Sequence, residues 1–120
     1  MARVLYIEDD FNNRVLVRRI LMAEGYEVDE AENAAAGIDM ASRNPPDLIL
    51  MDISMPGMDG LVATAQIRSK PNLSSIPIIA VTANVMEGDR EKTLSAGCDG
   101  YIQKPIDVDS FTDQVSRYLR

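Results

Sequence analysis

The sequence contains no histidine, no tryptophan and a single cysteine, Cys98, among its 120 residues. A lone cysteine cannot form an internal disulfide bond, and a chain without histidine lacks the usual ligands of a zinc site. The same absence excludes nucleophiles that depend on a histidine base, which leaves carboxylate, hydroxyl and lysine chemistry. We therefore expect a protein of a reducing compartment, the cytoplasm.

Basic residues and long apolar segments are also scarce. Lysine and arginine number 12 against 19 aspartates and glutamates, for a formal charge of −7. Nucleic-acid binding depends largely on clustered basic side chains, so this balance argues against direct contact with DNA or RNA. No segment approaches the roughly 20 apolar residues of a membrane helix, and residues 1–7 lack the pattern of an export signal. We expect a single domain over residues 1–120 that contacts neither membrane nor nucleic acid.

Short β-rich runs alternate with longer segments that have helical spacing. The predicted strands span residues 3–7, 27–31, 47–51, 76–81 and 100–102. The predicted helices span residues 12–24, 33–42, 59–69, 87–96 and 108–119. Repeated strand-helix-strand units indicate an α/β fold with a doubly wound, five-stranded parallel sheet, because consecutive parallel strands need crossover helices, which cover both faces.

The spacing of apolar residues also predicts the buried side of several helices. The predicted inner faces of the first, third and last helices are Val15, Leu16, Arg19, Ile20 and Ala23; Val62, Ala65 and Gln66; and Phe111, Val115 and Leu119. Gly25 and Gly97 are predicted to end the helices that precede them.

Polar residues gather where the predicted strands end. They are Glu8, Asp9 and Asp10 after the first strand, Asp52 after the third, Thr82 and Ala83 after the fourth, and Lys104 and Pro105 after the fifth. Ligands of open parallel sheets bind beyond these ends, and crowded carboxylates there require a cation. Oxygen ligands without histidine suit Mg²⁺, which commonly also binds phosphate oxygens. The pattern therefore predicts a magnesium site for a phosphorylated substrate, with Lys104 and Thr82 stabilising charge on a phosphoryl group.

Each of these residues has an ordinary structural explanation when it is considered alone. Acids before a helix can cap it, and Asp10 is the residue to which this applies best. Asp52 alone is more typical of a turn, Thr82 of a strand end and Lys104 of a solvated surface. Their coincidence at four strand ends favours the functional interpretation.

Four motifs together resemble a known family. They are I-E-D-D at residues 7–10, D-L-I-L-M-D-I-S-M-P-G-M-D-G at residues 47–60, V-T-A at residues 81–83 and K-P-I at residues 104–106. Over essentially the whole chain, their order and spacing resemble the receiver domain of bacterial two-component response regulators, of the CheY type. The resemblance implies a flavodoxin-like, CheY-like fold with strand order 2-1-3-4-5.

The resemblance assigns expected roles to the acidic residues. Asp52 falls on the phosphoaccepting aspartate, which also binds the metal. Glu8 and Asp9 fall on the family's acidic pair, with Asp9 a Mg²⁺ ligand and Glu8 acting through water; the pair Asp9 and Asp10 is the alternative. Ser54 falls where the family offers a backbone carbonyl to the metal.

The resemblance also assigns roles on the other side of the expected site. Thr82 and Tyr101 match the family's switch pair. Lys104 matches the lysine that contacts the phosphoryl group, and its bond to Pro105 is expected to be cis. Gly60, at the end of the loop after Asp52, is expected to take a backbone conformation that other residues resist.

These roles imply a function in two-component signal transduction, with Mg²⁺ as the cofactor. Asp52 is expected to accept a phosphoryl group from the phosphohistidine of a sensor histidine kinase or histidine phosphotransfer protein. The domain is expected to catalyse only its own phosphorylation and dephosphorylation. A downstream effector protein or output domain would read the change, and a phosphorylation-dependent dimer is a further expectation.

Three other functions share parts of this pattern. A haloacid-dehalogenase-like phosphatase also uses a strand-end aspartate with magnesium, but it needs a second aspartate where this chain has Ser54. A flavodoxin shares the fold, but only 5% of the residues are aromatic and none is tryptophan. A degenerate receiver would act as a constitutive interaction module, although all the expected site residues are present.

Overall fold

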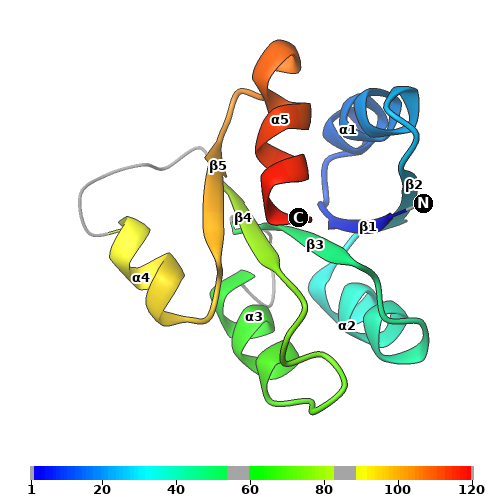
Figure 1. Ribbon diagram of the computed structural model, residues 1–120. Helices are drawn as coiled ribbons and strands as arrows, with labels where there is room; N and C mark the ends of the chain where they lie inside the picture. The colour runs from blue at the N-terminus through cyan, green and yellow to red at the C-terminus, as the bar shows by residue number, and fades with distance from the viewer. Residues whose placement is uncertain (1, 54–59, 83–88, 120) are drawn as a thin grey trace.

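The computed structural model describes residues 2–53, 60–82 and 89–119 (for Asp89 and Arg90 the backbone alone). Within these residues, five strands alternate with five helices (Figure 1). The strands are β1 (Arg3–Ile7), β2 (Glu27–Ala31), β3 (Leu48–Asp52), β4 (Ile78–Thr82) and β5 (Gly100–Gln103). The helices are α1 (Phe11–Ala23), α2 (Ala34–Arg43), α3 (Gly60–Arg68), α4 (Asp89–Ser95) and α5 (Val108–Tyr118). The predicted order of elements is confirmed.

Most element ends lie within a residue or two of the prediction, and β4 shows why some shift. It begins at Ile78 rather than at Ile76. The amide of Ile76 donates to the carbonyl of Leu73 in the preceding turn, and Pro77 has no amide hydrogen to give to a neighbouring strand. The strand therefore starts only after the proline.

The strands form one parallel sheet in the order β2-β1-β3-β4-β5, as expected. β3 and β4 lie inside the sheet and every one of their residues is buried. Strands covered by helices on both faces have this continuous burial. From β1 the chain continues to β2 on one side, and from β3 it continues to β4 on the other side. The carboxyl ends of β1 and β3 therefore flank the crevice where open sheets of this kind bind ligands.

Helices cover both faces of the sheet. α1 and α5 lie on one face and α2 and α3 on the other, with α4 beside β5 (Figure 1). The α1/α5 core consists of Val4, Tyr6, Val17, Leu21, Leu48, Leu50, Ile79, Val81, Ile102, Phe111 and Val115. The α2/α3 core consists of Leu5, Ile7, Ala31, Ala34, Ala41, Ile49, Met51, Ala63, Ile67, Leu73, Ile76, Ile78, Ala80 and Cys98. Alternate residues of each strand therefore enter opposite cores.

The predicted inner face of α1 is wrong except at Ile20, which is partly buried and packs against the α1/α5 core. Its buried residues are Val17 and Leu21, and Leu16 is 38% exposed. Apolar residues are present on several sides of this helix, including an exposed Met22, so periodicity alone does not choose the side that meets the sheet.

The predicted inner face of α3 is also wrong, whereas that of α5 is confirmed. α3 buries Gly60, Ala63, Thr64 and Ile67, and Val62 is 47% exposed. Small residues let this helix approach the sheet, and a hydrophobicity pattern gives them little weight. In α5, Phe111 and Val115 are buried and Leu119 packs beside them.

Glycines follow two helices where the sequence predicted their ends. A third glycine, Gly60, has a different role from the one expected. Gly25 and Gly97 follow α1 and α4 with positive φ angles of 91° and 113°. Gly60 instead opens α3 without a positive φ, so the expected unusual backbone conformation is wrong. A Cβ at Gly60 would lie 2.6 Å from the carbonyl oxygen of Asp52, so glycine is needed there because α3 approaches the end of β3 closely.

Candidate functional site

Four parallel strands bring the predicted site residues to one edge of the sheet. Glu8 and Asp9 follow β1, and Lys104 follows β5. Asp52 and Thr82, expected just after their strands, are the last residues of β3 and β4, because they still pair with Val81 and Gln103 of the neighbouring strands.

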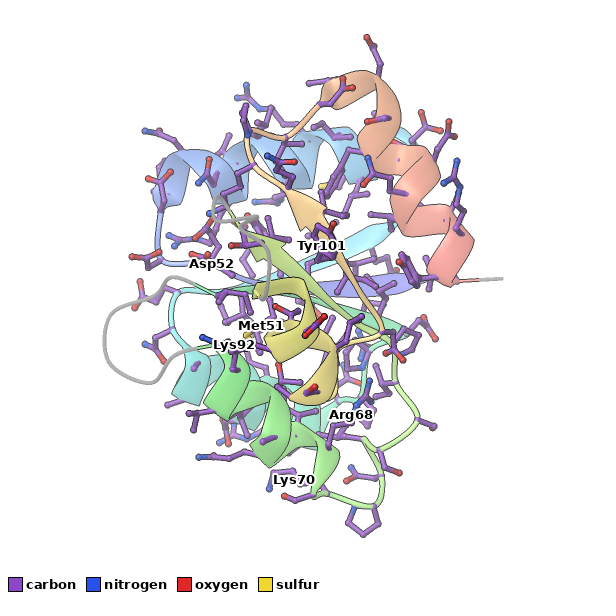
Figure 2. The ribbon with its side chains drawn as sticks, turned by 90° about the vertical axis from the view of Figure 1, so that its left-hand side faces the viewer. Met51, Asp52, Arg68, Lys70, Lys92 and Tyr101 are labelled. Atoms are coloured by element: carbon purple, nitrogen blue, oxygen red, sulfur yellow. The ribbon has the colours of Figure 1, made fainter. Side chains whose placement is uncertain are left out.

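Three carboxylates converge at this edge. One oxygen from each of Glu8, Asp9 and Asp52 can be chosen so that all lie within 4.8 Å of one another. Glu8 and Asp52 are buried and Asp9 is exposed, so the cluster opens to solvent on the Asp9 side. Figure 2 shows Asp52 apart from Tyr101, which belongs to the outer strand β5. The arrangement concentrates negative charge in a crevice that a cation or a phosphoryl group can enter.

Lys104 supplies the positive charge nearest to these acids among the described residues. Its Nζ lies 2.8 Å from Glu8 Oε1 and 3.4 Å from Asp52 Oδ1. Burial lowers the pKa of Lys104, but the hydrogen bond to Glu8 and the charge of Asp52 outweigh burial, and its pKa is raised overall. The ammonium therefore stays charged. The Lys104–Pro105 bond is cis, as predicted.

Glu8 is fully buried yet ionised. Burial alone would raise its pKa, but side-chain hydrogen bonding with Asp52, Lys104 and Tyr6, together with the charge of Lys104, outweighs burial and lowers the pKa to about 2. Both Glu8 and Lys104 are thus charged at neutral pH.

The donor atoms of this cluster fit a hard divalent cation. They are carboxylate oxygens, which Mg²⁺ prefers. Glu8 Oε2 is buried and accepts no hydrogen bond from any residue that the structure describes. A buried carboxylate oxygen without a partner is unfavourable unless a cation or water completes its surroundings. Asp9 and Asp52 each bring a carboxylate oxygen within 4.8 Å of a Glu8 oxygen.

Asp10 has a different environment from its two acidic neighbours. It is the N-cap of α1, and its side chain accepts a hydrogen bond of 3.2 Å from the amide of Asn13. Arg14, one helical turn on, donates to the carbonyl oxygens of Glu8 and Asp9 at 2.7 and 3.1 Å. Glu8 and Asp9 thus lie in the cluster with Asp52, whereas Asp10 caps the helix.

Sequence reasoning missed two side chains that contact this cluster. The hydroxyl of Tyr6 donates to Glu8 Oε1 at 2.9 Å, and Asn13 Nδ2 donates to the same oxygen at 3.0 Å. Alternation along β1 could have found the first, since residues two apart in a strand share a face. Asn13 could have been found from its place in the first turn of the helix that follows the acids.

The predicted switch pair lies on β4 and β5. Thr82 is buried, and Tyr101 is half-buried and pairs in register with Ala80, two residues before Thr82. The amide of Lys104 donates to the carbonyl of Thr82, which links the end of β5 to the end of β4. Ser54, Ala83 and residues 55–59 of the expected loop lie outside the described residues.

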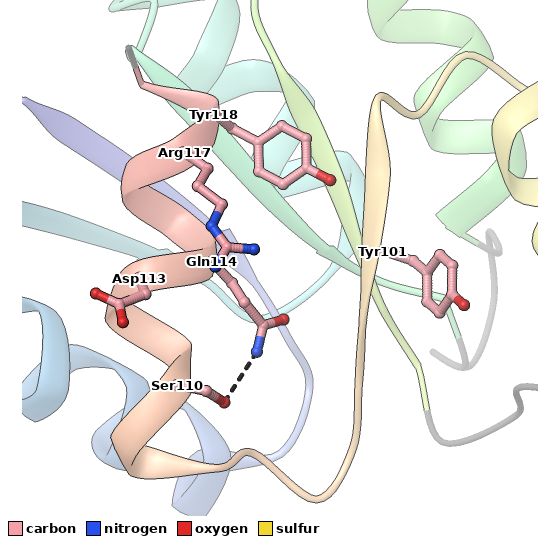
Figure 3. Close-up of a pocket in the computed structure, with 6 residues that line it drawn as sticks. All are labelled: Tyr101, Ser110, Asp113, Gln114, Arg117 and Tyr118. Atoms are coloured by element: carbon pink, nitrogen blue, oxygen red, sulfur yellow. Dashed lines mark hydrogen bonds between the residues drawn. The ribbon is translucent and has the colours of Figure 1, made fainter.

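A pocket away from the acids lies between β5 and α5. Its lining residues are Tyr101, Ser110, Asp113, Gln114, Arg117 and Tyr118 (Figure 3). Tyr118 extends from α5 toward β5, where a Cβ at Gly100 would overlap its hydroxyl, and Gln114 donates to Ser110 at 3.0 Å. Glu8, Asp9 and Asp52 are not among the residues that line this pocket.

The sequence and the fold have close counterparts among known proteins. Residues 4–116 match the family model of the response regulator receiver domain. The polar-differentiation response regulator DivK of Brucella anthropi is 41% identical over 116 residues, which are 97% of this chain and 94% of that protein. DivK of Brucella ovis is 40% identical over the same length.

Solved structures agree with this match. The chemotaxis protein CheY4 of Vibrio cholerae superposes with a TM-score of 0.95 at 26% identity, covering 99% of each chain. The receiver domain of a sensor histidine kinase from Pseudomonas aeruginosa has a TM-score of 0.91 at 35% identity, covering 98% of this chain and 97% of that one. That structure holds a magnesium ion in its active-site cleft.

The fold and site define a signalling domain with a CheY-like architecture. The chain belongs to the response regulator receiver domains, and its function lies in two-component signal transduction. Among the helices of the described residues, none has the length and apolar character needed to cross a membrane.

Proposed function

We propose that Asp52 accepts a phosphoryl group and that Glu8, Asp9, Thr82 and Lys104 support this reaction. The observation that carries the proposal is the convergence of three carboxylates within 4.8 Å of one another, with an ammonium 3.4 Å from Asp52. A structural aspartate at a strand end needs neither the neighbouring acids nor the lysine beside them. The match to the receiver family supports the same role for Asp52.

Asp9, Asp52 and the backbone carbonyl of Ser54 would hold Mg²⁺, with Glu8 acting through a water molecule. When bound, the ion would neutralise charge on the transferred phosphoryl group. Glu8 Oε2, which is buried without a hydrogen-bond partner in the described part of the chain, and the oxygen-only donor set support this assignment. Ser54 is included as a ligand because of its position in the sequence, two residues after Asp52.

The chain's own residues account for the transfer. One carboxylate oxygen of Asp52 attacks the phosphorus atom in line as the bond from phosphorus to the partner's histidine nitrogen breaks. The electron pair of that bond leaves with the nitrogen. Lys104 turns from the carboxylates toward an oxygen of the phosphoryl group, and the Thr82 hydroxyl donates to another. Water later hydrolyses the acyl phosphate and restores Asp52.

The donor must be a partner, because this chain has no histidine. A sensor histidine kinase or a histidine phosphotransfer protein fits that requirement, and the cytoplasm is where such partners would meet it. The domain, taken as one unit over residues 1–120, would catalyse only its own phosphorylation and dephosphorylation. A shift of Thr82 and Tyr101 on phosphorylation would alter the surface read by an effector protein, an output domain or a second copy.

The test is phosphorylation in the absence of any partner protein. With Mg²⁺ and acetyl phosphate, the wild-type chain should gain one phosphoryl group, seen as an increase of roughly 80 Da in intact mass. Asp52→Asn should gain none, whereas Asp39→Asn, which removes an exposed aspartate of α2, should behave as wild type. A phosphorylated Asp52→Asn variant would contradict the proposal, and an unmodified wild type would favour the degenerate receiver.

A further inference from the structure

Tyr6 is the last residue but one of β1 and has no exposed surface, and it lies among the side chains of the α1/α5 core. Burial of a hydroxyl in an apolar cluster is unfavourable unless it is hydrogen-bonded, and phenylalanine would fill the same space without that cost. The hydroxyl donates to Glu8 Oε1 at 2.9 Å. Burial and the negative charge of Glu8 both raise the pKa of Tyr6, so it remains a donor. Packing alone does not explain why this position carries a hydroxyl.

The contacts of Glu8 are strongly asymmetric. Oε1 accepts hydrogen bonds from Tyr6, Asn13 and Lys104 at 2.9, 3.0 and 2.8 Å. Oε2 is buried and has no hydrogen-bond partner among the residues in the described ranges. Three donors on one oxygen hold the carboxylate in a single orientation. The other oxygen is thereby left without a donor among these residues, in a carboxylate that lies in one cluster with Asp9 and Asp52.

The three donors differ in how firmly they are held. Lys104 also approaches Asp52 at 3.4 Å, so it is the donor that would turn away when a phosphoryl group is on Asp52. Asn13 lies in the first turn of α1 and is only partly buried. Tyr6 is attached to a strand inside the sheet and its ring is enclosed by the core. Its hydroxyl is therefore the most fixed of the three donors.

We propose that Tyr6 is a positioning residue whose hydroxyl holds Glu8 in the orientation that favours magnesium binding, including when Lys104 has moved to the phosphoryl group. This inference rests on the proposed function, because it assumes that the acidic cluster takes up Mg²⁺. Residues that orient the groups around a metal commonly matter to metal affinity as much as the groups themselves.

The test compares Tyr6→Phe with the wild type in binding of Mg²⁺ alone, measured by calorimetry on the unphosphorylated chain. Loss of the hydroxyl should weaken binding by roughly 10-fold. In phosphorylation by acetyl phosphate, the Mg²⁺ concentration for half-maximal rate should rise by the same factor, while the rate at saturating Mg²⁺ stays close to wild type. A role in packing alone would move neither quantity.

Tyr26→Phe is the matched control. Tyr26 also packs against the α1/α5 core, but it precedes β2 and so lies at the amino ends of the strands, away from the acids at their carboxyl ends. It should bind Mg²⁺ as the wild type does. Asn13→Ala removes another donor from the same oxygen without touching the core, and it should weaken binding by less than Tyr6→Phe. Thermal unfolding in EDTA verifies that each variant is folded.

Unchanged Mg²⁺ affinity in Tyr6→Phe, with a wild type that binds the ion, overturns the positioning role and leaves the proposed function intact. An equal or larger effect of Asn13→Ala overturns the claim that Tyr6 is the principal donor. A lower rate at saturating Mg²⁺ with unchanged affinity also overturns the inference, because the hydroxyl would then act on the chemical step. A wild type that binds no Mg²⁺ overturns this inference together with the proposed metal site.

Discussion

Lys104 and Glu8 form a partly buried ion pair across 96 positions of sequence, with Nζ 2.8 Å from Oε1. The same ammonium lies 3.4 Å from Asp52, so one cation offsets the charge of two carboxylates from different strands. The Lys104 side chain is 19% exposed and that of Glu8 only 1%. Charges removed from water in this way are retained only where they are paired, and this pair connects β5 to the edge where the acids converge.

Removal of the lysine charge should slow phosphorylation of Asp52 while leaving Mg²⁺ binding in place. Lys104→Met keeps most of the apolar stem and removes the charge that stabilises the transferred group, so the rate with acetyl phosphate should fall by about 100-fold. Lys92→Met, on the exposed side of α4, is the control and should react at the wild-type rate. A wild-type rate in Lys104→Met would remove this lysine from the mechanism.

Mg²⁺ should stabilise the fold through Asp9 and not through Asp10. At 100 times the dissociation constant, a ligand of the folded state adds about 2.7 kcal/mol to the free energy of unfolding. Asp9→Ala should lose this increment in a thermal melt. Asp10→Ala should lose roughly 1 kcal/mol of capping energy but keep the increment. The opposite pattern, with the increment lost in Asp10→Ala and kept in Asp9→Ala, would make Asp10 and not Asp9 the metal ligand.

Acid should destabilise the metal-free chain in a window set by Glu8. Its pKa is lowered from 4.5 to about 2, so ionised Glu8 stabilises the fold above pH 4.5, and this contribution is lost as the pH falls toward 2. The wild type should therefore lose stability relative to Glu8→Gln across this interval. Urea unfolding of both chains in EDTA measures the difference. A difference that does not change with pH would contradict the lowered pKa.

Gly60→Ala should disturb the site through the backbone of Asp52. The added Cβ would lie 2.6 Å from the carbonyl oxygen of Asp52 and 2.8 Å from Cα of Ile53, so α3 must move away. We expect a loss of roughly 1–3 kcal/mol in stability and slower phosphorylation. Gly25→Ala is the control: it introduces strain at a positive φ with no atom within 4 Å, so it should lower stability without changing the phosphorylation rate.

Much of the fold followed from the sequence because its signals are local. Alternating apolar runs and helical periods predicted the element order, and the parallel sheet followed from the need for crossovers. The strand-end residues Glu8, Asp9, Asp52 and Lys104 could be located because parallel strands place their carboxyl ends together. The strand order and the roles of these residues came from the resemblance to a family.

The missed features depend on tertiary contacts. The inner faces of α1 and α3 depend on how each helix meets the sheet, which periodicity does not decide when apolar residues surround the helix or small residues line the contact. The close approach of Gly60 to Asp52 involves segments whose distance no local pattern encodes. The bond from Tyr6 to Glu8 was within reach of strand alternation, since residues two apart in a strand share a face.

The central claim is that Asp52 carries the phosphoryl group, and locating that group tests it most directly. After reaction with acetyl phosphate and Mg²⁺, borohydride reduces an aspartyl phosphate to homoserine with release of phosphate, which marks the residue for peptide mass spectrometry. The account predicts homoserine at position 52 alone, and only when Mg²⁺ is present. Homoserine at another aspartate, or a phosphoryl group that resists reduction because it sits on a hydroxyl, would contradict it.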